Sequence, residues 1–268
     1  MNKWITTSRP KTLTAAISPV LLGSALAYHD GFFNLITFLF ILISACLIQV
    51  GTNYSNDLFD YLRGADDDNR LGPNRAMQTG ILSKEEIQKA IIIIFVLAIF
   101  FGFYLALLGG WIIVAIGLLS IFFGISYTGG PYPLAYNGLG DIFVFIFFGL
   151  VAVSGTYYLH TGSVTFETIV LGSALGCLST SILVVNNLRD IDNDKKHNKN
   201  TLAVYIGRKF TRIEYLLLIA TAYLIPIYIS YTFANKSSVY IVYFTLPIAI
   251  RLIVDIFYKN DSALNMTL

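Results

Sequence analysis

Eight apolar runs, each long enough to cross a lipid bilayer as a helix, account for most of this 268-residue chain. A transmembrane helix needs about 20 apolar residues, and the runs cover residues 12–28, 33–54, 87–108, 111–127, 139–159, 166–188, 213–233 and 239–258. The runs are continuous, whereas the strands of a membrane β-barrel are short and alternate apolar with polar residues. Only 13% of the residues are charged, against about 25% in ordinary soluble domains. These features predict an all-α, polytopic membrane protein with eight transmembrane helices.

Lysine and arginine residues lie almost entirely on one side of the predicted membrane segments. On this topology that side receives seventeen of the eighteen, and the opposite side receives Lys236 alone. Because these residues accumulate in cytoplasmic loops, we expect a multi-pass protein of the cell (inner or plasma) membrane with a cytoplasmic amino terminus. The net charge of +2 gives no indication of a nucleic-acid partner.

Three further features favour ordinary structural roles. The amino-terminal residues lack a small-residue cleavage pattern after a short apolar core, so the first run is expected to remain as a helix. Cys46 and Cys177 fall inside apolar runs, where small residues pack helices together, and we expect neither a disulfide nor a thiol ligand. His160 stands alone on the side opposite the charged loops and is expected to be an interfacial residue.

A dense polar segment, residues 53–75, follows the second run. Asn56 and Asp60 are spaced i, i+4, so they share one face of a helix. The segment continues with a loop that Gly64 and Gly72 punctuate. Its acids and arginines are Asp57, Asp60, Asp66, Asp67, Asp68, Arg63, Arg70 and Arg75.

A second polar segment, residues 186–201, repeats this pattern about 130 residues later, after the sixth run. Asn186, Asp190 and Asp194 are spaced i, i+4, i+8 and would span roughly 12 Å along one helix face. Both segments are predicted to lie on the cytoplasmic side. The repeat therefore predicts two four-helix units with cytoplasmic caps, related by an axis near the membrane normal.

Two clusters of carboxylates cannot face each other bare, because like charges repel and raise each other's pKa. Mg²⁺ suits the space between them, since it takes oxygen ligands, usually one or two carboxylates completed by phosphate and water. No His/Cys cluster in the sequence offers a zinc or copper site. The flanking arginines and lysines could neutralise phosphate oxygens. The pattern predicts a site for Mg²⁺ and a diphosphate.

The apolar helices beside this site indicate that the rest of the ligand is apolar, as an isoprenoid tail is. An allylic diphosphate reacts by losing diphosphate, and the resulting cation needs a pocket without water. The irregular loop at residues 126–141 could supply a pocket wall through Tyr127, Tyr132 and Tyr136, whose ring faces attract cations. Arg9 and Lys11 precede the first run; they either set the topology or attract an anionic substrate group.

Three stretches of the sequence closely resemble one known family. They are NDLFDYLRGADDDNRLGPNR at 56–75, YTGGPYPLAYNGLGD at 127–141 and NNLRDIDNDKKHNKNTLAVYIG at 186–207. The two Asp motifs resemble those of the UbiA superfamily of intramembrane aromatic prenyltransferases. The middle loop and the RGAD and RLGP elements resemble its 1,4-dihydroxy-2-naphthoate polyprenyltransferase branch. The likeness runs from Trp4 onward, so we expect residues 1–268 to form one UbiA-type domain, although that superfamily normally has nine transmembrane helices.

The resemblance implies roles for particular residues. The expected ligands of Mg²⁺ are Asp57, Asp60, Asp66, Asp190 and Asp194, with Asp66 two positions away from the commonest spacing. All but Asp66 are also expected to be catalytic, together with Tyr127, which begins the loop over the reacting centre. The expected substrate-binding residues are Asn56, Arg75, Lys199, Asn186, Asn187 and Lys11.

The activity implied by the resemblance is transfer of a polyprenyl chain to 1,4-dihydroxy-2-naphthoate, with loss of CO₂ and diphosphate, to give demethylmenaquinol. The alternatives are a family member that uses 4-hydroxybenzoate, homogentisate or a porphyrin, a membrane phosphatidyltransferase, and a transporter. A phosphatidyltransferase would show one acidic motif, and a transporter would place its ionisable residues at mid-membrane. The sequence specifies neither the isoprenoid length nor the oligomeric state.

Overall fold

The computed structural model describes residues 3–66, 71–232 and 237–267, so Asp67, Asp68, Arg70 and Lys236 lie outside the described residues. Regular structure in the described ranges is helical, apart from one isolated bridge between Asn137 and Asn200. The α-helices are α1 (Lys3–Ser8), α2 (Leu13–His29), α3 (Leu35–Leu62), α4 (Lys84–Ser126), α5 (Gly140–Val144), α6 (Ala152–Thr161), α7 (Phe166–Lys196), α8 (Leu202–Thr232) and α9 (Leu246–Tyr258). Shorter turns are η1 (Pro10–Thr12), η2 (Leu134–Tyr136), the π-helix η3 (Phe145–Val151), η4 (Ser237–Thr245) and η5 (Asp261–Met266).

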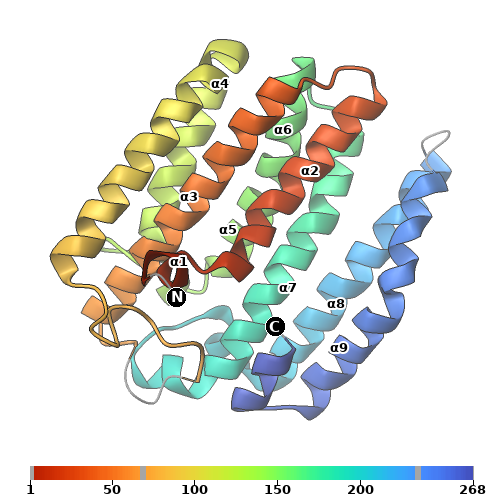
Figure 1. Ribbon diagram of the computed structural model, residues 1–268. Helices are drawn as coiled ribbons and strands as arrows, with labels where there is room; N and C mark the ends of the chain where they lie inside the picture. Colours follow the sequence, from red (N-terminus) through yellow and green to blue (C-terminus); the bar gives the residue numbers. More distant parts are fainter. Residues whose placement is uncertain (1–2, 67–70, 233–236, 268) are drawn as a thin grey trace.

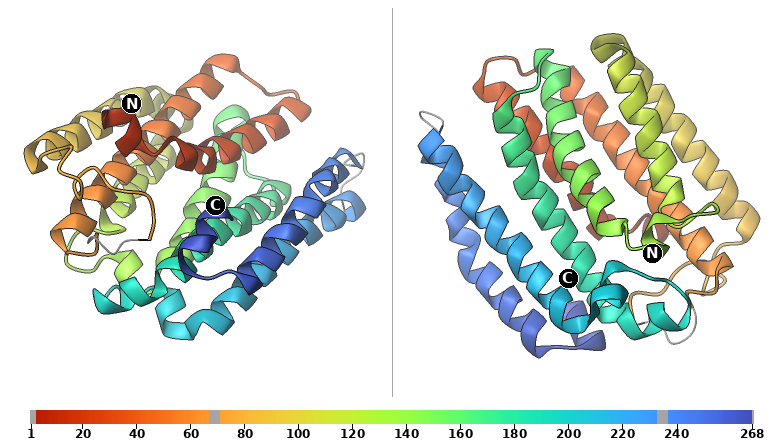
Figure 2. Two further views of the ribbon diagram at one scale, coloured as in Figure 1. Left: turned by 60° about the horizontal axis from the view of Figure 1, so that its bottom comes forward. Right: turned by 180° about the vertical axis from the view of Figure 1, so that it is seen from behind.

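All eight expected apolar runs fall in these helical segments, but two of them share α4. The chain reverses direction inside α4 at Gly110, whose φ of 69° and ψ of −160° are not helical. Glycine adopts such a conformation because it has no Cβ. Counted as continuous elements, seven helices in the described residues are long and apolar enough to cross a membrane. Figure 2 shows the two limbs of α4 lying side by side.

The helices form one bundle in which neighbours run along each other (Figure 1). On one side of the bundle α3 packs against α4, and on the other side α7 packs against α8. Helix α2 packs against α6 and α3. The π-helix η3 approaches α7 very closely, since a Cβ on Gly149 would lie 2.5 Å from the Cα of Gly176. This contact holds η3, and the phenylalanines it carries, beside the interior of the bundle.

A buried apolar cluster fixes the carboxyl end of the described chain beneath the end of α7. Leu188 of α7, Ile256 of α9 and Leu264 of η5 are each fully buried and belong to this cluster. The polar residues that follow Leu188 are therefore held next to the turn η5.

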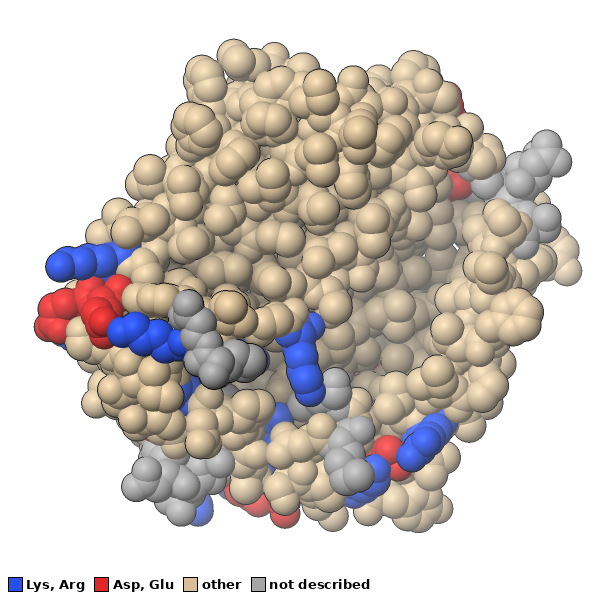
Figure 3. Space-filling model, viewed as in Figure 1, with Lys and Arg blue, Asp and Glu red and all other residues tan. Residues whose placement is uncertain are grey.

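Charged side chains gather at one end of the bundle. On the face in Figure 3 most lysine, arginine and acidic residues lie toward the end that holds both termini, and the rest is almost entirely uncharged. Long apolar helices with charge concentrated at an end are what a bilayer requires, because ionised groups are costly in its core.

Candidate functional site

The first polar segment places three buried side chains at the end of α3. Asn56, Asp57 and Asp60 are 9%, 2% and 2% exposed. Asp57 accepts hydrogen bonds from the backbone N–H groups of Ala76 at 3.1 Å and Met77 at 3.3 Å. These bonds fold the loop after Arg75 back onto α3. Asn56 accepts a hydrogen bond from the hydroxyl of Thr128 at 2.9 Å, which ties α3 to the loop after α4.

Asp60 is the carboxylate around which the first motif is built. The hydroxyl of Tyr136 donates to it at 2.9 Å, and Nη2 of Arg75 donates at 3.4 Å. Nε of Arg75 lies 3.6 Å from Asp66, so this buried arginine joins two acids of the motif. Burial lowers the pKa of Arg75, but the charges of Asp66, Asp60 and Asp57 together raise it by more, so the pKa is raised overall. The guanidinium is therefore held charged.

Lys199 joins the first motif to the second. Its Nζ lies 3.9 Å from Asp60 and 3.8 Å from Asp194, which stands on the last turns of α7. The same Nζ lies 5.5 Å from the centre of the Tyr136 ring. Burial lowers the pKa of Lys199, but Asp60 and Asp194 outweigh it and raise the pKa overall. The two polar segments thus meet around one partly buried ammonium group.

Asp190 has a different set of partners. Nε and Nη2 of Arg189 donate to its two carboxylate oxygens at 2.8 and 2.6 Å. Nη1 of Arg189 donates to the side-chain oxygen of Asn265 at 2.9 Å. The amide of Asn265 in turn donates to the carbonyl of Leu71 at 2.9 Å. Asp190 is therefore connected to the loop of the first motif through the turn η5.

Arg189 and Asn265 were not among the predicted site residues. Arg189 stands in the second polar segment beside Asp190, but adjacent residues on a helix do not normally face each other, so their pairing was not expected. Asn265 lies in a polar tail without periodicity, where no sequence signal points to a role.

A cavity of about 1360 Å³ opens next to these acids and runs into the bundle. Its polar mouth includes Asn56, Asp57, Arg75, Asn186, Arg189, Lys11 and Tyr127. Its interior is apolar and includes Ala98, Leu105, Ile113, Phe143 and Phe147. Asn186 lines the cavity. The predicted site residues that do not line it are Asn187, Asp60, Asp66, Asp190, Asp194 and Lys199. The combination suits a ligand with a charged head and a long apolar body.

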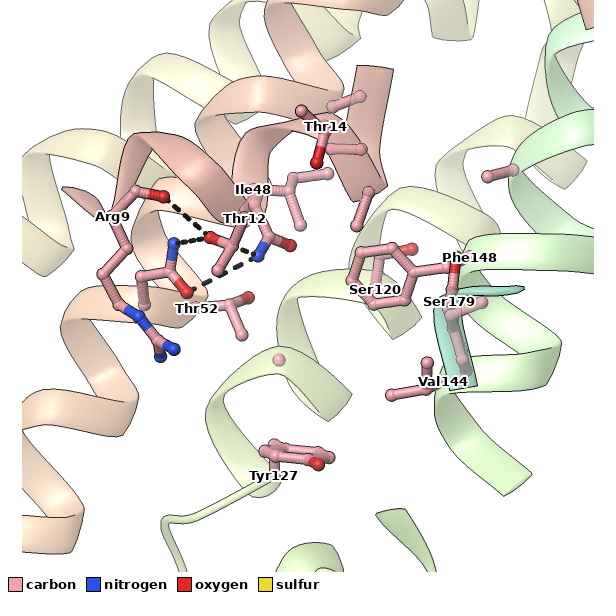
Figure 4. Close-up of a pocket in the computed structure, with 18 of the residues that line it drawn as sticks. Arg9, Thr12, Thr14, Ile48, Thr52, Ser120, Tyr127, Val144, Phe148 and Ser179 are labelled. Carbon is pink, nitrogen blue, oxygen red and sulfur yellow. Dashed lines mark hydrogen bonds between the residues drawn. The ribbon is translucent and has the colours of Figure 1, made fainter. Parts of the chain in front are cut away.

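Tyr127 lies at one end of this cavity, beyond the side chains of Ser120, Val144 and Phe148 (Figure 4). Burial, followed by the charges of Asp141 and Asp60, raises the pKa of its hydroxyl, which therefore stays protonated. The other two tyrosines of the loop, Tyr132 and Tyr136, do not line the cavity, contrary to what was expected. Tyr136 contacts Asp60, and Tyr132 is 62% exposed.

The model of the UbiA prenyltransferase family matches residues 16–265 of this sequence. The chain belongs to the UbiA prenyltransferase family. A match of this extent covers both polar segments, the loop after α4 and every long helix.

Several curated relatives of this UbiA chain share one name. The 1,4-dihydroxy-2-naphthoate octaprenyltransferase of Haemophilus influenzae is 37% identical over 83% of this chain and 75% of its own length. The protein of that name from Escherichia coli is 40% identical over 76% of this chain and 68% of its own. The Bacillus subtilis protein is 31% identical over 97% of this chain and 83% of its own.

Solved structures share the UbiA fold. The structure of a UbiA homolog from Archaeoglobus fulgidus bound to GPP and Mg²⁺ matches with a TM-score of 0.70 and 17% identity, over 99% of this chain and 94% of that one. The homolog bound to DMAPP and Mg²⁺ matches with a TM-score of 0.69, also at 17% identity, over 94% of this chain and 85% of that one. At this identity the likeness concerns the fold.

The residues of the two polar segments fit a Mg²⁺ ion. Their donors are carboxylate and amide oxygens, which Mg²⁺ prefers. The ammonium of Lys199 is a positive charge held between Asp60 and Asp194, so carboxylates from both motifs already surround a cation. No three Asp, Glu, His or Cys side chains of the described residues form a metal-binding group by themselves. Mg²⁺ commonly takes one or two carboxylates and completes its shell with phosphate and water.

Proposed function

We propose that this protein transfers a polyprenyl chain from an allylic polyprenyl diphosphate to 1,4-dihydroxy-2-naphthoate. The allylic carbon–oxygen bond breaks, a carbon–carbon bond forms at the ring carbon that bears the carboxyl group, and CO₂ and diphosphate leave to give demethylmenaquinol. The names of the curated relatives support this acceptor and the menaquinone pathway. The observation that carries the proposal is the meeting of Asp60 and Asp194 around Lys199, next to Arg75, which pairs with Asp60 and lines the mouth of an apolar cavity.

The proposed site residues divide by chemistry. Asp57, Asp60, Asp66, Asp190 and Asp194 would hold Mg²⁺, which supplies positive charge to the departing diphosphate when it is bound. Arg75 and Lys199 would donate to phosphate oxygens, because both are charged and lie among these acids. The further substrate contacts that we propose are Asn56, Asn186, Asn187 and Lys11, of which all but Asn187 line the cavity.

The chain itself supplies the conditions for the reaction. The apolar cavity keeps water away from the allylic cation, which would otherwise be hydrolysed. The ring of Tyr127 would stabilise that cation by its negative face. The hydroxyl stays protonated, so it would act as a hydrogen-bond donor and not as a base.

We propose that residues 1–268 form one domain with two four-helix units and cytoplasmic caps. The gathering of charge at the end that holds the mouth supports a cytoplasmic site in the cell membrane. A transporter fits less well, since the described carboxylates of the two motifs lie at the ends of α3 and α7 and not at their centres.

The deciding experiment is incubation of purified protein with Mg²⁺, octaprenyl diphosphate and a panel of aromatic acids, with product masses measured. We expect the product from 1,4-dihydroxy-2-naphthoate to be lighter than a simple adduct by one CO₂. A product that retains the carboxylate, or a preference for 4-hydroxybenzoate, would assign the protein to another branch of the family. If the protein forms no product with any of the acceptors, the proposal is wrong.

A further inference from the structure

Helix α9 carries an arginine on the face that is turned away from the bundle. Ala249 and Ile256 are buried in the cluster shared with α7 and α8. Arg251 is exposed, and its neighbours Ile250 and Val254 are 53% and 48% exposed. Figure 1 shows α9 at the edge of the bundle beside α8. Arg251 does not line the cavity, so this guanidinium lies apart from the proposed active site.

Two contacts between α8 and α9 define how deep Arg251 lies. Nε of Arg212 donates to the carbonyl of Ile256 at 2.9 Å, and the hydroxyls of Tyr223 and Thr245 lie 2.7 Å apart. Arg251 stands roughly midway between these contacts, about 7.5 Å along the helix from Ile256. It therefore lies inside a segment that is long and apolar enough to cross a membrane. An ionised side chain at such a position is costly unless a counter-charge accompanies it.

The acceptors near Arg251 are occupied by other cations. Asp255, one helical turn later, lies 2.8 Å from Nζ of Lys259. Nη2 of Arg212 donates to the carbonyl of Lys259 at 3.4 Å and to the side-chain oxygen of Asn260 at 2.6 Å. In the described ranges no acidic side chain pairs with Arg251. Its counter-charge therefore has to come from elsewhere.

An exposed tyrosine lies on the same face of α9, nearer the charged end of the bundle. Tyr258 follows Arg251 by seven residues, which places both on one helix face, and it is 83% exposed. The two positions lie about 10 Å apart along the helix, and an extended arginine side chain reaches roughly 7 Å. Long cationic side chains bend toward the membrane surface, and tyrosine rings lie at the level of the lipid headgroups. The guanidinium and the phenol can thus converge where phospholipid phosphates lie.

We propose that Arg251 and Tyr258 bind the phosphate group of an anionic phospholipid on the outward face of α9. The planar guanidinium presents paired N–H donors that match two phosphate oxygens, and the phenol adds a third donor. A lipid with a net negative charge supplies the counter-charge that Arg251 lacks, whereas a zwitterionic headgroup already neutralises its own phosphate. The acyl chains would lie along Ile250 and Val254. This site does not depend on the proposed reaction.

The test is native mass spectrometry of the full chain released from nanodiscs that contain phosphatidylglycerol and phosphatidylcholine in equal amounts, with the same acyl chains. The unaltered protein should retain phosphatidylglycerol preferentially. Arg251→Gln should lower that preference by about fivefold, the effect of one cation near an anionic membrane surface. Arg251→Lys should keep part of it. Lys89→Gln is the matched control, since Lys89 is also exposed but interacts with the charge of Glu85, and it should change nothing.

Two neighbouring substitutions should act in opposite directions. Asp255→Asn should raise the retention of phosphatidylglycerol, because it releases Lys259 as a second cation. Lys259→Gln should lower it, because Asp255 then becomes available to Arg251 one turn away. A general loss of structure would lower retention in both variants, so a fall in Asp255→Asn would contradict the proposal.

Equal preference for phosphatidylglycerol in Arg251→Gln and the unaltered protein would overturn the proposal. The same spectra give the number of chains in each particle. If Arg251→Gln separates an oligomer and leaves lipid retention unchanged, the outward face of α9 is an interface between copies of this chain and the lipid site does not exist.

Discussion

Nη1 of Arg189 donates a 2.9 Å hydrogen bond to the side-chain oxygen of Asn265, two residues that stand 76 positions apart in the sequence. Through this bond the exposed Asn265 holds in place the guanidinium that donates hydrogen bonds to Asp190. The other end of the Asn265 amide holds the carbonyl of Leu71, so one side chain links the two Asp motifs.

Asn265→Ala should weaken Mg²⁺-dependent binding of an unreactive geranyl thiodiphosphate by about tenfold, the lower end of the range for outer supports of metal ligands. Thermal stability should change little, because the side chain is exposed. Isothermal titration calorimetry measures the affinity. Asn260→Ala is the control, since Asn260 lies in the same turn but accepts a hydrogen bond from Arg212; equal losses in the two variants would contradict a specific role for Asn265.

Asp60→Asn and Asp190→Asn should each lower the rate of prenyl transfer by about 10²–10³-fold, the usual cost of losing one transition-state contact. The double variant should lose far less than the product of the two losses, because residues that act as a unit are not additive. Initial rates across a Mg²⁺ titration give the comparison. Asp30→Asn, at the other end of the bundle, can keep its hydrogen bond from Tyr157 and should be nearly silent. Wild-type rate and metal dependence in Asp190→Asn would refute the shared site.

Lys199→Met should shift metal and diphosphate binding in opposite directions. Removing an ammonium 3.8 Å from Asp194 and 3.9 Å from Asp60 relieves its repulsion of Mg²⁺, so the metal should bind about threefold to tenfold more tightly. The KM for polyprenyl diphosphate should rise, because a donor to its phosphates is lost. Lys199→Arg should restore both values in part, and Lys195→Met, an exposed neighbour, should change neither. Weaker binding of Mg²⁺ in Lys199→Met would show that the lysine does not share the metal's position.

Tyr136→Phe should lower the free energy of unfolding by about 1.5–3 kcal/mol, the usual contribution of a hydrogen bond to a charged group. The hydroxyl donates to buried Asp60 at 2.9 Å, while the ring, which faces Arg63 and Lys199, is kept. Thermal unfolding in detergent measures the change. Tyr132→Phe, at a side chain 62% exposed in the same loop, should have no effect, and an unchanged unfolding temperature in Tyr136→Phe would place the support of Asp60 elsewhere.

Single cysteines should report the orientation in the membrane. In a background with Cys46 and Cys177 replaced by alanine, Asn74→Cys and Asn198→Cys, both at exposed positions, should react with an impermeant thiol reagent only from the cytoplasm. Ser163→Cys, in the turn before α7, should react only from outside. Labelling of either of the first two from the outside would exclude the proposed parallel arrangement.

The helices and the meeting of the two motifs followed from the sequence, and several contacts did not. Backbone groups in lipid must be paired within a helix, so a long apolar run leaves one solution. Matching Asn and Asp spacings at the ends of two such runs predicted that Asp60 and Asp194 would lie near each other, and Lys199 bridges them. The third and fourth apolar runs, separated in the sequence by Gly109 and Gly110, form the two limbs of α4 and meet at Gly110.

Tertiary contacts account for the rest. The outward position of Tyr132 depends on how the loop after α4 packs on α3, and the role of Asn265 depends on the burial of Leu264 beside α7. Neither a spacing nor a composition encodes such packing. Asp190 was expected to face the first motif, and in the fold it accepts two hydrogen bonds from its own neighbour Arg189.

Arg75 and Lys199 both lie within 4 Å of Asp60, one from each motif. Under the proposed mechanism the acids would keep positive neighbours after diphosphate and Mg²⁺ leave, so the site would not have to be reassembled for the next substrate. Small zinc domains behave in the opposite way, since they unfold when the metal is removed. In the proposed site, Arg75 and Lys199 would act as counter-ions of the acids between turnovers, and Mg²⁺ would take over that role when substrate binds, while the fold stays intact.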